Sequence, residues 1–60
     1  MDSRTIIRML KHDGWYQVRI HGDHWQFKHH QKPGVVTVPH TRKDIPKGTF
    51  NSILKRAGLK

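Results

Sequence analysis

Hydrophobic positions near the N-terminus follow the spacing of an amphipathic helix. Ile6 and Leu10 are four residues apart within the segment 3–12, and residues at this spacing share one face of a helix. Asp2 and Ser3 stand where this helix would begin, and either side chain can accept a hydrogen bond from its first free amide groups. The pattern therefore predicts a helix over residues 3–12.

Helical spacing returns near the C-terminus. We expect Asp44 to cap this second helix and Pro46 to lie in its first turn, where a missing amide hydrogen costs nothing. Gly14 and Gly58 follow the two helical segments and are the expected left-handed residues that end them. The apolar face of the second helix carries Phe50, Ile53, Leu54 and Ala57.

The middle of the chain changes to the alternation of β-strands. The segment 15–20 is rich in aromatic and β-branched residues. Apolar and polar residues alternate from Tyr16 to Ile20 and again over 24–28, which is typical of strands with one buried face. A third short strand is predicted over 35–38, where Val36 and Val38 are the expected core residues.

The turn between the first two strands predicts how they pair. Gly22 and Asp23 fit a two-residue type II′ turn with glycine in its first central position. His21 then faces His24, and we expect the same register along the whole hairpin. The apolar face would contain Ile20 opposite Trp25, Val18 opposite Phe27, and Tyr16 opposite His29.

The same register gathers polar groups on the other face of the hairpin. Two amphipathic helices and three strands predict an α+β fold of order α-β-β-β-α. We expect a three-stranded antiparallel sheet with both helices on its apolar face, so that the polar face stays open to solvent or a ligand. That face pairs His21 with His24, Arg19 with Gln26, and Gln17 with Lys28.

The charge of the chain narrows the class of ligand that it can bind. The 60 residues fit one domain, residues 1–60, and carry 12 Lys and Arg against 4 Asp and Glu, a formal charge of +8. Such a strong positive field on so small a surface favours a polyanion, most often nucleic acid. The small size argues against a large substrate pocket.

Other classes of protein are disfavoured by what the chain lacks. With no cysteine, disulfide staples and thiolate metal sites are excluded. No apolar run has the length of a membrane span or a signal peptide, so we expect a cytoplasmic protein. We expect no cofactor.

Histidines offer the chemistry that a basic surface alone does not. The chain has 6 histidines, and imidazole is the usual group for proton transfer near neutral pH. RNA supplies its own nucleophile, the 2′-hydroxyl, so cleavage needs a base, an acid and cations rather than a metal. Paired carboxylates for a two-metal nuclease are absent. His24 is the first candidate, with His21 as a partner, although both also fit ordinary solvated turn residues.

Three further sets of residues fit an ordinary structural role as well as a functional one. His29 and His30 are adjacent, so on a strand they point to opposite faces and do not chelate a metal together. Trp25 is expected in the core rather than stacked on a base, and Trp15 is expected to be half exposed. A second phosphate-contacting stripe or a solvated face would be formed by Arg42, Lys43, Lys47, Lys55, Arg56 and Lys60.

Several segments, in this order, resemble the HicA family of toxin–antitoxin ribonucleases. The resemblance covers nearly the whole chain, and its segments are Gly14-Trp15, Val18-Arg19, Gly22-Asp23-His24-Trp25-Gln26-Phe27, Gly34-Val35-Val36-Thr37-Val38-Pro39-His40, Lys43-Asp44-Ile45-Pro46-Lys47-Gly48-Thr49-Phe50 and Ser52-Ile53-Leu54-Lys55-Arg56-Ala57-Gly58-Leu59.

The resemblance implies a fold like a double-stranded RNA-binding domain and a metal-independent mRNA interferase that arrests growth. It also implies a HicB-type antitoxin that covers the active site. The catalytic histidine of the family matches His24, after the turn glycine Gly22; Asp23 departs from the serine frequent in relatives. We expect the phosphate to be held by Arg19 and Lys28, with lesser roles for His21 and Lys43.

Two alternatives remain at this point. The first is a non-catalytic RNA-binding module with the same fold, which makes only shape and backbone contacts. The second is a small structural protein whose basic face binds an acidic partner. Turnover of RNA separates the ribonuclease from both.

Overall fold

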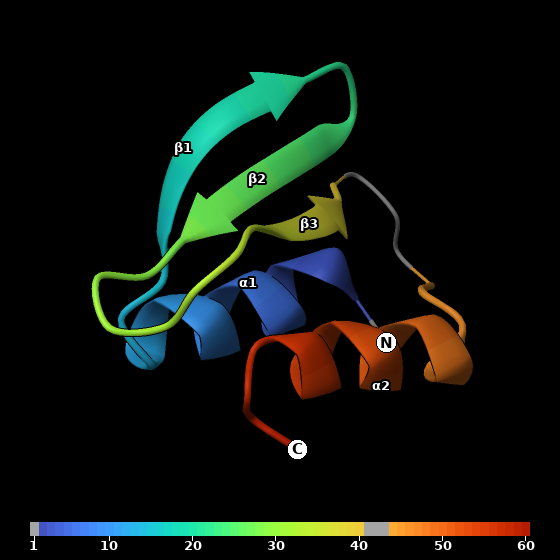
Figure 1. Cartoon of the computed structure of the whole chain (residues 1–60). Coiled ribbons are helices and arrows are strands. Elements are labelled where there is room, and N and C mark those ends of the chain that lie inside the picture. The colour runs from blue at the N-terminus through green and yellow to red at the C-terminus, as the bar shows by residue number, and fades with distance from the viewer. Residues whose placement is uncertain (1, 41–43) are drawn as a thin grey trace.

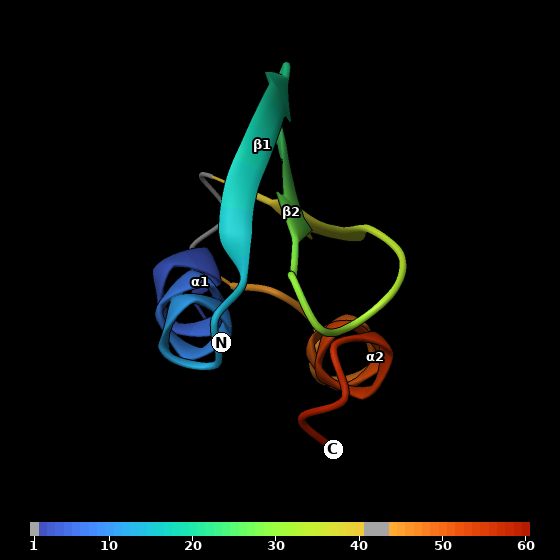
Figure 2. The same ribbon diagram turned by 60° about the vertical axis from the view of Figure 1, so that its left-hand side comes forward.

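The predicted order of elements is confirmed. A computed structural model describes residues 2–40 and 44–60 and has the order α-β-β-β-α, with the strands in an antiparallel sheet of order β1-β2-β3. Both helices lie on one side of the sheet (Figure 1, Figure 2). The elements are α1 (Ser3–His12), β1 (Tyr16–His21), β2 (His24–Lys28), β3 (Val36–Pro39) and α2 (Lys47–Arg56).

Helix α1 begins and ends as its sequence predicts. The carboxylate of Asp2 accepts a hydrogen bond from the Arg4 amide at 2.8 Å, which satisfies one of the free donors of the first turn. At the other end Gly14 has φ +102°, and the Trp15 amide donates to the Leu10 carbonyl at 3.0 Å. This reversal sends the chain directly from α1 into β1.

Helix α2 begins differently from the prediction. Pro46 is the N-cap and has an extended backbone, and no side chain caps the helix, so the expected cap by Asp44 is wrong. The physical reason is Ile45, which is buried in the core and separates Asp44 from the helix start. The C-terminal end is as predicted, because the Leu59 amide donates to the Leu54 carbonyl across Gly58.

The predicted hairpin register holds only near the turn. His21 pairs with His24 and Ile20 with Trp25, as expected, but a β-bulge between Gln17 and Arg19 shifts the remaining pairs by one residue. Gln17 therefore lies opposite Phe27, and its predicted pairing with Lys28 is wrong. Tyr16 lies opposite Lys28, and the predicted pairings of Val18 with Phe27 and Tyr16 with His29 are wrong.

The core lies between the helices and the strands β2 and β3. Phe27, Val36 and Val38 are buried there, which confirms the two predicted valines of the third strand. Trp25 is partly buried and packs against this core. Trp15, expected to be half exposed, is only 2% exposed. The helices contribute Ile6, Ile7, Leu10, Phe50, Ile53, Leu54 and Ala57.

Strand β1 contributes little to this core, which corrects the predicted apolar face. Tyr16, Val18 and Ile20 are 39%, 46% and 54% exposed. The helices contact the sheet mainly through β3, and the β1–β2 hairpin rises beyond them (Figure 2). The bulge also moves Tyr16 to the other face of the sheet, because side chains alternate along a strand.

Within residues 2–40 and 44–60, no helix is long and apolar enough to cross a membrane.

Candidate functional site

The β1–β2 turn presents His24 at the tip of the hairpin. Gly22 has φ +62°, the left-handed value expected for the first central residue of the turn, and a side chain there would meet open space. Glycine is therefore required by the backbone conformation and not by crowding. The turn places His24 opposite His21 at the first position of the central strand.

His24 is accessible and its backbone is held on both sides. Its side chain is 60% exposed, and its Nε2 lies 3.4 Å from the Asp23 carboxylate. The Cα partner of His24 on β3 is Pro39, and the next residue, His40, donates its amide hydrogen to the Asp23 carbonyl at 2.7 Å. The edge strand β3 thus fixes the turn, while the imidazole stays open to a substrate.

The outer face of the sheet brings three predicted residues to the side of His24. His21 is its cross-strand partner, and Arg19 pairs with Gln26, which is on the same face because it is two residues from His24. The diagonal from Arg19 to His24 is about 7–8 Å, within reach of a guanidinium. Lys28 shares the face but is about 13 Å along the strand. Arg19 is therefore the nearer cation of the two.

Lys43, the fifth predicted site residue, and its neighbour Arg42 lie outside the described residues. The other basic residues of the predicted second stripe belong to or follow α2, which lies below the hairpin in Figure 2. Two of them make hydrogen bonds within the protein, since Arg56 donates to the Val35 carbonyl at 3.1 Å and Lys60 to the Asn51 side chain at 2.7 Å. These contacts favour a structural role for that pair.

The other histidines near the sheet are engaged by aromatic rings. His40 stacks on Trp25 with centroids 3.9 Å apart, on the face opposite His24. His30 stacks on Tyr16 with centroids 4.8 Å apart. His29 packs edge-on against Trp15, so His29 and His30 diverge. Among the described residues, no three His, Cys, Asp or Glu side chains gather as metal ligands.

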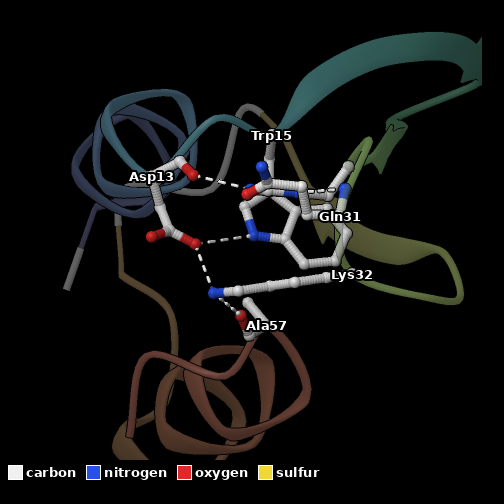
Figure 3. A network of polar contacts seen from close by, with 6 residues as sticks. Asp13, Trp15, Gln31, Lys32 and Ala57 are labelled. Carbon is white, nitrogen blue, oxygen red and sulfur yellow. Dashed lines mark hydrogen bonds and ion pairs between the residues drawn. The ribbon is translucent and has the colours of Figure 1, made fainter.

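A polar network joins the ends of both helices to the loop after β2 (Figure 3), and His29 belongs to it. Its Nε2 lies 2.7 Å from the Asp13 carbonyl, and its Nδ1 accepts the Gln31 amide hydrogen at 3.0 Å. Nδ1 therefore carries no proton, and Nε2–H donates to Asp13. Both ring nitrogens are used, so this histidine has no lone pair or proton left for a substrate.

Asp13 is the centre of this network. Its carboxylate accepts hydrogen bonds from Lys32 Nζ at 2.6 Å and from the Trp15 indole at 3.2 Å. Lys32 also donates to the Ala57 carbonyl at the end of α2. The hydrogen bond from Lys32 is the main reason why the pKa of Asp13 lies below its ordinary value.

Sequence reasoning missed this network. Asp13 and Lys32 are 19 residues apart, and no periodic pattern or motif links them. The only local signal is that Asp13 is one of just four acidic residues in a chain of 12 cations, which makes any carboxylate a candidate ion-pair partner.

Comparison with known families gave a match along most of the chain. A family model described as the HicA toxin of bacterial toxin–antitoxin systems matches residues 3–59. A search of curated proteins gave no match.

Proposed function

The chain belongs to the HicA toxin family of bacterial toxin–antitoxin systems, and we propose that it is a metal-independent endoribonuclease that cleaves mRNA and arrests growth. The observation that carries the proposal is His24, an exposed imidazole at a hairpin turn to which the His40 amide donates a hydrogen bond, on the same sheet face as Arg19. Family membership supplies the toxin role, and the side chains of this face supply the chemistry.

The reaction proposed for this face is a transesterification. His24 acts as general base and takes the proton of the RNA 2′-hydroxyl, whose oxygen then forms a bond to the adjacent phosphorus. The bond from phosphorus to the 5′-oxygen breaks, and that oxygen receives a proton from His21, the cross-strand partner. Arg19 stabilises the charge that develops on the phosphate oxygens.

Replacement of His24 tests the assignment. We expect His24→Ala to lower the cleavage rate about 100-fold or more, because general-base catalysis contributes on the order of 10²–10⁴. The exposed side chain makes no core contact, so the circular-dichroism spectrum and thermal midpoint should not change. Expression of the variant should no longer arrest growth.

The matched control is His12→Ala, which removes another exposed histidine at the end of α1. This control should cleave at the parent rate, with chelator present in every assay. A folded His24→Ala variant that cleaves as fast as His12→Ala would refute the role of His24.

The proposed protein partner is a HicB-type antitoxin. A toxin–antitoxin family implies an antitoxin, and a formal charge of +8 favours a contact surface that carries carboxylates. The edge strand β1 also exposes Val18 and Ile20, which a partner with apolar groups can cover. Addition of the protein encoded beside this chain should inhibit cleavage at equimolar ratio; full activity at molar excess would contradict the proposal.

A non-catalytic RNA-binding module is the second candidate, because the α-β-β-β-α order and the basic surface suit RNA binding without cleavage. Degradation of RNA in molar excess over the protein separates the two. Retardation in a gel without degradation would favour the binding module.

A further inference from the structure

The bulge in β1 creates a second feature on the outer face of the sheet. It turns Tyr16 to the side of Lys28, where the Tyr16 ring stacks on His30 with an interplanar angle of 29°. Tyr16 is 39% exposed and His30 is exposed as well. The pair is therefore a fixed aromatic surface that solvent reaches.

A shallow depression of about 360 Å³ surrounds this pair, and Tyr16, Lys28, His30, Pro33 and Gly34 line part of it. The loop from β2 to β3 forms its far wall. The size suits a single planar ring with its sugar rather than a folded partner. The depression thus has room for about one nucleotide.

The cations beside the depression differ in how they are used. Lys32 is paired with the Asp13 carboxylate at 2.6 Å and donates to the Ala57 carbonyl, so its charge is already compensated. Lys28 is exposed on the outer face, directly opposite Tyr16. Lys28 is accordingly the cation that can approach a phosphate next to a stacked ring.

The depression also lies in line with His24. Tyr16 faces Lys28, which is four residues from His24 along β2 and on the same side of the sheet. The separation is about 13 Å along the strand, a length covered by a few nucleotides of a single strand. A strand of RNA laid along β2 can thus reach both positions.

We propose that Tyr16 and His30 form a base-stacking site for a nucleotide that flanks the cleaved bond of a single-stranded RNA, while Lys28 contacts its phosphate. The proposal rests on the ribonuclease function and adds where the substrate is held. Every base has a π-face, so the site holds RNA without reading its sequence. Its prearranged aromatic pair lowers the ordering cost of binding.

Binding of two probes by inactive protein tests the site. In the His24→Ala background, fluorescence anisotropy measures the Kd of a short single-stranded RNA and of an abasic oligonucleotide of the same length and charge. We expect Tyr16→Leu to weaken RNA binding roughly 10-fold. The same change should alter binding of the abasic probe less than twofold, since that probe has no base to stack.

Matched variants separate stacking from folding. Tyr16→Phe keeps the ring and should bind RNA within about twofold of the background protein, whereas His30→Ala should weaken it several-fold. Met9→Ala changes a side chain of matching exposure, 38%, on α1, and should change neither Kd. If Tyr16→Leu does not fold, the comparison is made with His30→Ala, which alters only an exposed loop residue.

Each outcome has one meaning. Equal loss of both probes, or unchanged RNA binding by Tyr16→Leu and His30→Ala, would overturn the stacking site and leave the ribonuclease proposal intact. Failure of the background protein to bind either probe would overturn the ribonuclease proposal itself.

Discussion

His24 and His29 stand at the two ends of one central strand and have opposite surroundings. Both ring nitrogens of His29 are engaged by Asp13 and Gln31, and its ring packs against Trp15. The ring of His24 is mostly exposed, and its Nε2 lies 3.4 Å from the carboxylate of Asp23. The same residue type is structural in one place and available for proton transfer in the other, because hydrogen bonds and packing decide which role is open.

The two histidines also differ in what their loss removes. His29 ties the end of α1 to the loop after β2, so its loss should reduce stability. His24 is outside the core, so its loss should reduce activity alone.

Among the residues around His29, removal of Trp15 should lower the free energy of unfolding the most. Trp15 is 2% exposed, and its indole donates to the Asp13 carboxylate. We expect Trp15→Ala to lower the free energy of unfolding by about 3–5 kcal/mol, a large share of the stability of so small a domain. Urea unfolding followed by circular dichroism measures the loss; a change below 1 kcal/mol would contradict this account.

Two glycines, one beside each histidine, form a finer test. Gly14 has φ +102°, and a Cβ built there lies 2.8 Å from His29 Nε2, whose ring is held by hydrogen bonds and cannot move freely. Gly14→Ala should therefore cost about 3 kcal/mol. Gly22 has φ +62° and open space around it, so Gly22→Ala should cost only about 1 kcal/mol.

The loss of cleavage activity should be larger for Gly22→Ala than for Gly14→Ala, the reverse of their order in loss of stability. Gly22→Ala distorts the turn that aims His24, so its cleavage rate per folded molecule should fall more than that of Gly14→Ala. Urea titration gives the folded fraction, and cleavage is then measured at that fraction. Equal activity losses for the two variants would remove the distinction between the regions.

Acid should lower the thermal stability of the protein by protonating Asp13 in the network around His29. The pKa of Asp13 in the folded protein lies below the ordinary value of 3.8, mainly because Lys32 donates to its carboxylate. Its stabilising contribution is complete above about pH 3.8 and is lost as pH falls through the lower, folded-state pKa. The difference in thermal midpoint between the parent and Lys32→Met should therefore narrow below about pH 3.8, while the part due to the Lys32–Ala57 hydrogen bond remains. Because Asp2 also has a lowered pKa, the difference between the two proteins is the quantity to follow.

Local sequence signals predict helix α1 and the position of His24 in the hairpin. Helix α1 was predictable from the spacing of Ile6 and Leu10 and from the cap at Asp2. The facing positions of His21 and His24 follow from the glycine of the turn, whose conformation selects the register next to it. The pairing of His21 with His24 could be predicted from the turn and the residues next to it alone.

The rest depends on contacts that no local pattern encodes. The alternation of Tyr16, Val18 and Ile20 suits an unbroken strand, and no glycine or proline marks the bulge that moves Tyr16 to the outer face. Burial of Trp15 depends on the neighbouring helix end and His29. Such non-local packing overrides strand periodicity, which is why the first half of the predicted register was wrong.

The most direct test compares RNA cleavage by His24→Ala and His29→Gln in the presence of a metal chelator, expressed per folded molecule. His29→Gln keeps a side-chain donor that can reach the Asp13 carbonyl, so a folded population remains to be assayed. This account predicts a rate at least about 100-fold below the parent for His24→Ala and within about threefold for His29→Gln. Slow cleavage by His29→Gln together with fast cleavage by His24→Ala would contradict the role of His24. It would place the proton transfer at His29, at the other end of the strand.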